Sequence, residues 1–138
     1  MFLKPRGRGA SFKNGSMASR NFHLYDGSKT FMFAHDKEYL TKDGVYSKFQ
    51  EYRSWINVHA AGIGSSSDFK ADQNNMHFRN SYDDGEGNEK GKRSEVIGVT
   101  VNNKPDKARG KRGILLLFEE AGRFAKLTEA WNMCRRSA

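Results

Sequence analysis

The sequence predicts an α/β fold in which a mostly parallel sheet is flanked by helices. Short apolar runs typical of buried strands occur at residues 30–34, 96–101 and 114–118. Segments with helical spacing of their apolar residues lie between and after these runs, and such alternation indicates parallel strands. The run at 114–118 is apolar throughout, as expected for a parallel strand that is covered on both faces. With 138 residues, the chain has the length of one domain.

The first half of the chain predicts a helix, a strand and an interrupted helix. The first helix begins near Ser11, whose hydroxyl is expected to cap it. Its apolar side is expected to contain Phe12, Met17, Ala18, Phe22 and Leu24. A DGS turn then leads into the strand at 30–34, and a second helical stretch runs from Asp36 with a break near Asp43. The side chains expected to point inward from that stretch are Tyr39, Leu40, Val45, Tyr46 and Phe49.

The second half predicts a variable insertion followed by two strands and a helix. Residues 56–93 are rich in Gly, Ser, Asn and Asp, so we expect small strands there and a polar loop at 83–93. A strand at 96–101 and a basic connector at 102–113 precede the strand at 114–118. The last helix is expected at 123–136, with one apolar face formed by Phe124, Leu127, Ala130, Trp131 and Cys134.

Charge and cysteine content narrow the classes of function. The 24 Lys and Arg residues exceed the 16 Asp and Glu residues, for a formal charge of +8, which favours phosphate or nucleic-acid partners. One cysteine excludes an internal disulfide framework and a cysteine-rich zinc site. The longest apolar run falls far short of the ~20 residues that span a bilayer. The sequence does not begin with an apolar stretch of signal-peptide length, so we expect a soluble protein that is neither exported nor bound to membranes.

Two adjacent carboxylates follow the apolar run in ILLLFEEAG. A strand that delivers two acids to its end suits metal-assisted nucleotide hydrolysis, because one acid can hold Mg²⁺ while the next orients or deprotonates water. Adjacent strand residues point to opposite sides, which separates the two roles. We assign Glu119 to the metal and Glu120 to the water. The alternative is a polar strand terminus without catalytic function.

A basic glycine-rich segment, KPRGRGASFK, opens the chain. Glycines allow tight turns that direct backbone N–H groups at phosphate, and a helix that begins near Ser11 adds its positive end. The strict GxxxxGK[ST] pattern is absent, so nonspecific contact with nucleic acid stays an alternative. A phosphate loop that opens a helix, followed by a strand ending in acids, is nevertheless the order found in P-loop NTPases.

Three blocks carry a resemblance to a known family. They are PRGRGASFKNGSMASRN at the start, FAHDKEYLTKDG in the middle and KARGKRGILLLFEEAGRFAKLTEAW near the end. Together they resemble the large terminase subunit of tailed bacteriophages, the ATPase that drives DNA packaging. The resemblance implies a RecA-like P-loop fold of the additional-strand class, with ATP and Mg²⁺ as cofactors. It also implies that the protein translocates double-stranded DNA into the procapsid in the host cytoplasm. In that work it would form a homo-oligomeric ring and bind the portal protein and the small terminase subunit.

The resemblance assigns roles to individual residues. Residues 4–13 correspond to a degenerate Walker A loop in which Arg8 is the loop arginine, with a catalytic role. The residues that contact the nucleotide are then Arg6, Gly7, Arg8, Gly9, Ala10, Ser11, Phe12 and Lys13. Residues 114–120 correspond to the Walker B strand, with Glu119 at the metal position and Glu120 as the catalytic glutamate. Because Ser11, Phe12 and Lys13 replace the usual Gly-Lys-Ser/Thr, the phosphate lysine is Lys13 or, second, Lys4; Glu119 replaces the commoner Asp.

Some features of a terminase large subunit have no counterpart here. The resemblance to the ATPase domain extends along the given sequence and includes no C-terminal nuclease domain. We therefore expect a partial ATPase domain that hydrolyses ATP weakly or not at all by itself. Residues 104–112 hold five cations and one acid, and either form a solvated loop or contact DNA phosphate or a neighbouring subunit's nucleotide. Two further functions stay open: a non-enzymatic basic module that binds nucleic acid, and another P-loop motor such as a helicase.

Overall fold

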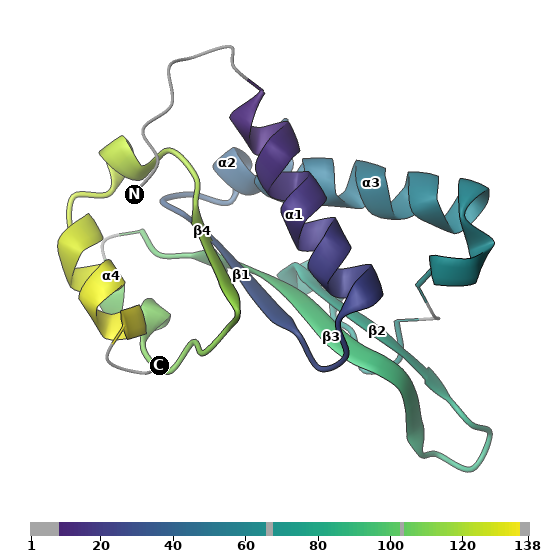
Figure 1. The fold of residues 1–138 in the computed structure, drawn as a ribbon. Helices are drawn as coiled ribbons and strands as arrows, with labels where there is room; N and C mark the ends of the chain where they lie inside the picture. The colour runs from purple at the N-terminus through teal and green to yellow at the C-terminus, as the bar shows by residue number, and fades with distance from the viewer. Residues whose placement is uncertain (1–8, 66–67, 103, 136–138) are drawn as a thin grey trace.

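Four strands form one mixed sheet in a computed structural model that describes residues 9–65, 68–102 and 104–135. The strand order is β2-β3-β1-β4 (Figure 1). The central strand β1 (Lys29–Ala34) pairs in parallel with β3 (Glu89–Thr100) and with β4 (Leu115–Phe118). β2 (His77–Asp83) pairs antiparallel with β3. The predicted α/β class is therefore confirmed, and the antiparallel strand makes the sheet mixed.

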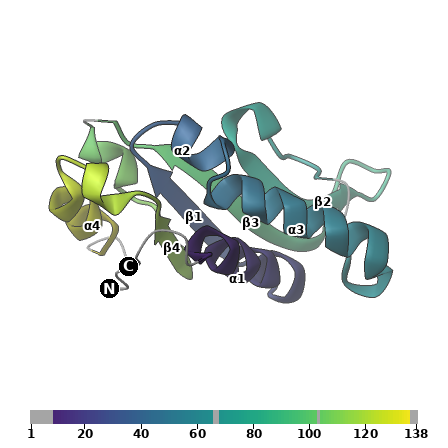
Figure 2. The same ribbon diagram turned by 90° about the horizontal axis from the view of Figure 1, so that it is seen from above.

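The helices cover the two faces of this sheet differently, as Figure 2 shows. On one face lie α1 (Ala10–Leu24), the short α2 (Glu38–Thr41) and α3 (Val45–His59). On the other lie α4 (Leu127–Arg135) and the 3₁₀ turn η3 (Pro105–Ala108). Alternation along β1 sends Met32 and Ala34 into the first core and Phe31 and Phe33 into the second. The central strand is thus buried on both faces.

Aromatic rings dominate the first core. Phe49 of α3 contacts Phe22 of α1 and Phe78 of β2 edge to face, with ring centroids 5.3 and 5.6 Å apart. Of the predicted inward residues, Leu40, Val45, Tyr46 and Phe49 are buried, whereas Tyr39 is only partly buried against the same core. This core holds α1 and α3 against the sheet and so sets the position of α1 relative to the strands.

The apolar side predicted for α1 is wrong in part. Ala18 and Phe22 are fully buried, but Phe12, Met17 and Leu24 remain 48%, 38% and 48% exposed. The buried side of α1 is narrower than predicted, and it includes Gly15, where α1 closely approaches α3. In α4, Trp131 likewise stays 47% exposed, although Ala130 and Cys134 are buried as expected.

Several predicted boundaries also differ. Residues 89–93, predicted as part of a polar loop, form the first part of β3, and only 84–88 connect it to β2. Their charges pair across the hairpin, as Arg79 of β2 does with Glu89 and Glu95 of β3, so the polar sequence conceals a strand. Phe69 and Met76 lie outside the strands, and the last helix begins only at Leu127, after the 3₁₀ turn η4 (Ala121–Arg123).

Ser11 does not cap α1. The N-cap position belongs to Gly9, whose left-handed backbone (φ 63°, ψ 24°) suits glycine, and no side chain accepts a capping hydrogen bond there. Ser11 lies in the first turn instead and makes the long-range contact described below. Within the described part of the chain, none of the helices has both the length and the hydrophobicity that a membrane span requires.

Candidate functional site

The parallel strands bring their carboxyl ends to one edge of the sheet. Such edges are where open α/β sheets bind ligands. At this edge Glu119 extends the pairing of β4, because its N–H donates to the carbonyl of Phe33 at 2.8 Å. Leu115 and Leu117 point to the face that α1 covers, so alternation directs the Glu119 side chain to the same face. The Glu119 side chain therefore faces the first turn of α1.

Ser11 and Glu119 meet there. Ser11 Oγ donates a 2.7 Å hydrogen bond to Glu119 Oε1, joining residues 108 positions apart in the sequence. Glu119 is 6% exposed, and Ser11 is half-buried. The contact places a hydroxyl and a nearly buried carboxylate side by side, between the start of a helix and the end of a strand.

The first turn of α1 contains no acidic residue, and Gly9 precedes it. The first backbone N–H groups of a helix have no partner within the helix, which suits them to bind an anion. The Glu119 carboxylate already lies beside Ser11 in this turn. The helix dipole adds partial positive charge at this end. The Lys13 N–H is already used, since it donates to the Gly9 carbonyl at 3.0 Å. The donors nearest to Gly9 are those suited to a phosphate group.

Glu120 diverges from Glu119. Its backbone is left-handed (φ 49°), its side chain is exposed, and its carbonyl accepts the N–H of Arg123 at 2.8 Å. The two adjacent carboxyl groups thus have different surroundings: Glu119 lies against α1 and Glu120 faces solvent. This difference in environment is what separate chemical roles require.

The other predicted nucleotide contacts are placed unequally. Phe12 points outward, with Lys48 Nζ 4.3 Å from the centre of its ring. Lys13 is exposed and leaves the helix about 200° around the axis from Ser11. Ala10 is buried beside Gly9 at the helix start. Lys4, Arg6, Gly7 and Arg8 lie outside the described residues.

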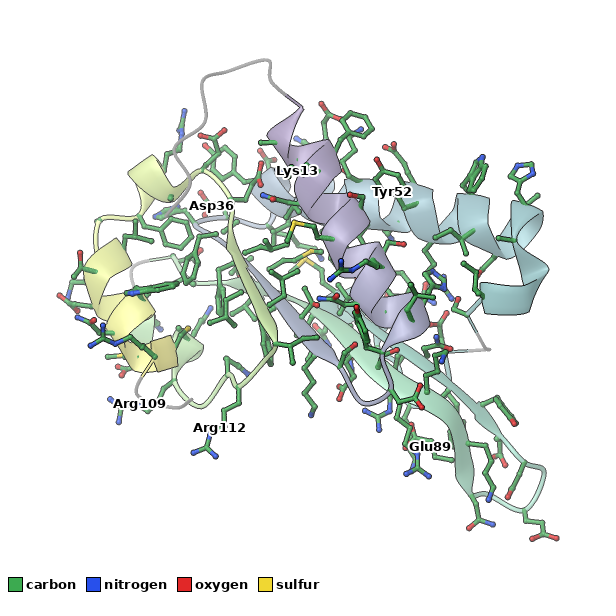
Figure 3. All side chains as sticks on the ribbon, in the orientation of Figure 1. Lys13, Asp36, Tyr52, Glu89, Arg109 and Arg112 are labelled. Carbon is green, nitrogen blue, oxygen red and sulfur yellow. The ribbon has the colours of Figure 1, made fainter. Side chains whose placement is uncertain are left out.

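Two further polar residues lie at the same edge of the sheet, and they were not among the predicted site residues. His35 and Asp36 directly follow β1, and His35 Nδ1 lies 2.8 Å from Asp36 Oδ2. Figure 3 shows Lys13 and Asp36 in the same upper part of the molecule. Their signal is the one that indicated Glu119, namely polar residues that directly follow an apolar strand.

Comparisons with known proteins add no assignment. No protein-family model, no curated protein and no solved structure matches the chain.

Proposed function

We propose that the edge formed by Ser11 and Glu119 binds the Mg²⁺ complex of ATP, and that the chain is part of an ATP-driven motor that moves double-stranded DNA. The hydrogen bond between Ser11 Oγ and Glu119 Oε1 carries this proposal. It joins the helix start that follows the glycine-rich basic segment to the strand that ends in two acids. The terminase resemblance supplies the choice of DNA packaging as the work performed.

The residues at this edge fit a magnesium–nucleotide complex. Among the described residues, no group of three or more His, Cys, Asp and Glu side chains could hold a metal ion. Mg²⁺, however, is commonly bound through one or two carboxylates with substrate phosphates and water. The Glu119 carboxylate and the Ser11 hydroxyl are hard oxygen ligands of that kind. When bound, the ion supplies charge neutralisation at the phosphates.

The chain's own groups then have distinct tasks. The amides at the start of α1 orient the phosphates, and the preceding arginines and glycines extend that contact. Glu120 accepts a proton from the attacking water, whose oxygen bonds to the γ-phosphorus as the bond to the β-bridging oxygen breaks. The exposed position of Glu120 suits contact with water, whereas Glu119 is nearly buried.

The second candidate is a non-enzymatic basic module that binds nucleic acid. The formal charge of +8 favours it. It requires salt-sensitive DNA binding with no Mg²⁺-dependent nucleotide affinity. A helicase-type motor would share the nucleotide site proposed above and differ in the work performed.

The decisive variant for the hydrolytic role is Glu120→Gln. In single-turnover reactions with protein in excess over ATP, we expect it to abolish hydrolysis and to keep Mg·ATP affinity within about twofold, since only the proton acceptor is lost. Glu86→Gln, an exposed acid in the connection between β2 and β3, is the matched control. Unchanged hydrolysis in Glu120→Gln rejects the role of Glu120, and absence of Mg²⁺-dependent ATP binding by the wild-type chain rejects the proposed function.

A further inference from the structure

A hollow of about 590 Å³ lies where β3 continues past the end of β2. The register between these strands ends where His77 meets Ile97, and the Gly98 N–H still donates to the Met76 carbonyl, so β3 is open on that side only beyond Gly98. Residues 97–100 of β3 and Met76 form the floor. Lys37, Asn74 and Asn75 form one wall, and the connector between β3 and β4 forms the other.

Cations dominate the lining of this hollow. Lys37 comes from the segment after β1, and Lys107, Arg109 and Lys111 come from the connector. The carboxylate in the lining, Asp106, pairs with Arg109 at 3.0 Å. Even with that pair neutralised, three lysines face a shared space, and such convergence raises the local concentration of anions.

The partners of these lysines leave their charge uncompensated within the described chain. Lys37 Nζ donates to the Asn74 carbonyl at 3.4 Å, and Lys111 Nζ lies 5.9 Å from the Phe31 ring centre. Neither partner carries a negative charge. Lys107 is exposed and forms no ion pair with a described residue. The ammonium groups are therefore available to an external anion.

The open edge of β3 adds a backbone donor. Gly98 N–H donates to the Met76 carbonyl at 2.8 Å, toward the β2 side of the strand. Backbone groups two residues apart in a strand point the same way, so the Thr100 N–H faces the open edge as well. An amide beside several cations is the donor set that phosphate oxygens favour.

We infer that this hollow, the β3-edge groove, binds the phosphate backbone of double-stranded DNA. Two separate segments, the one after β1 and the connector, supply its charges, which suits successive phosphates better than one small anion. The open edge beyond Gly98 is too short to pair with a peptide as an added strand, which makes an acidic protein segment the weaker fit. Only the choice of DNA as the polyanion rests on the proposed function.

The groove and the proposed nucleotide site lie on opposite sides of the central strand β1. β3 and β4 are the two parallel neighbours of β1, and both the groove and Glu119 lie toward their carboxyl ends. DNA bound in the groove would contact the connector that leads directly into β4.

The test compares two triple variants that remove equal charge. The groove variant removes the positive charges of the connector and carries Lys107→Gln, Arg109→Gln and Lys111→Gln. The control variant removes three exposed lysines outside the groove and carries Lys42→Gln, Lys90→Gln and Lys126→Gln. Fluorescence anisotropy with a labelled 20-base-pair duplex measures affinity from 50 to 300 mM NaCl. We expect about tenfold or greater loss for the groove variant and a salt slope lower by about 2–3, with small changes in the control.

Further controls separate this inference from its alternatives. The charge-conserving variant Lys107→Arg, Arg109→Lys, Lys111→Arg should keep the wild-type affinity, and a circular dichroism melt checks that each variant folds. Equal losses of DNA affinity in the groove and control variants would overturn the inference. It would also be overturned if poly-glutamate of matched charge displaced the DNA while the groove variant kept its DNA affinity. Mg·ATP affinity, measured separately, should not change in the groove variant; its absence in the wild type would overturn the proposed function and leave the DNA result standing.

Discussion

Gly15 of α1 packs directly against Lys48 of α3. A Cβ at Gly15 would lie 2.8 Å from Lys48 Cβ and 3.0 Å from both Lys48 C and Phe49 N. Two of these atoms belong to the α3 backbone and cannot move without shifting that helix. The position therefore sets the distance between the two helices that cover the first core.

Gly15→Ala should destabilise the protein in spite of alanine's better helix propensity. The propensity gain of about 1 kcal/mol is outweighed by overpacking against α3, for a net loss of about 1–2 kcal/mol in the free energy of unfolding. Urea denaturation followed by circular dichroism measures it. Gly62→Ala is the control, because a Cβ there has no neighbour within 4 Å. Equal stability of Gly15→Ala and wild type would show that α1 does not pack on α3 in this way.

Asn80 connects β2 to the end of α1. Its Nδ2 donates to the Phe22 carbonyl at 3.0 Å, and the Ser94 hydroxyl donates to the same oxygen. Asn80 is 2% exposed, so Asn80→Leu removes a buried hydrogen bond without restoring water to the carbonyl. We expect a loss of about 1–3 kcal/mol in unfolding free energy. Asn88→Leu, at an exposed site in the connection between β2 and β3, should change it by less than about 0.5 kcal/mol.

Glu95 should make stability depend on acid pH. Burial alone would raise its pKa, but hydrogen bonds from His77 (2.8 Å) and Lys29 (3.0 Å), with the charge of Arg79, lower the pKa from 4.5 to about 2. Because the folded state lowers this pKa, the stabilisation is complete above about pH 4.5 and is lost as the pH falls toward 2. The size of this contribution is about 2–3 kcal/mol.

Comparison of the wild type with Glu95→Gln isolates that carboxyl group from Glu89, which titrates in the same range. Unfolding free energies at pH 6, 4 and 2.5 should converge for the two proteins as the pH falls. Glu38→Gln, which alters an exposed pair with Lys42, should run parallel to wild type. A constant difference between Glu95→Gln and wild type at all three pH values would contradict the lowered pKa.

Cys134 should be unreactive in the folded protein. It is 1% exposed, its Sγ lies 3.6 Å from the Ala108 carbonyl, and burial raises the pKa of its thiol. Both effects reduce the thiolate available to a reagent. Ellman's reagent should label it at least about 100-fold more slowly in native buffer than in 6 M guanidinium chloride. Rapid native labelling would place Cys134 outside the core between α4 and η3.

The strands could be predicted from the sequence where burial on both faces makes them apolar throughout. β1 from Phe31 onward is such a strand, and the short apolar β4, partly buried on both faces, was found in the same way. The first part of β3 could not, because it lies in a hairpin whose charged residues pair with one another or face solvent. In α1 the periodicity overstated the buried face, since the close approach at Gly15 depends on α3 and not on the helix itself.

The candidate site was predictable in its parts and not in its contacts. An apolar strand followed by acids marked Glu119 and Glu120, because the signal is local. The hydrogen-bond partner of the Ser11 hydroxyl could not be predicted in the same way, since local capping rules favour a role for this hydroxyl at the start of its own helix. Its hydrogen bond to Glu119 depends on the placement of β4 beside β1 and on the packing of α1 over both.

The central claim is that Ser11 and Glu119 together bind the magnesium–nucleotide complex. Isothermal titration of ATP into wild type, Ser11→Ala and Glu119→Gln, with 5 mM MgCl₂ and again with EDTA, tests it most directly. We expect the wild type to bind ATP more tightly with Mg²⁺, and both variants to lose about tenfold or more of that affinity while matching wild type in EDTA. ATP affinities that respond neither to Mg²⁺ nor to the two substitutions would contradict the account.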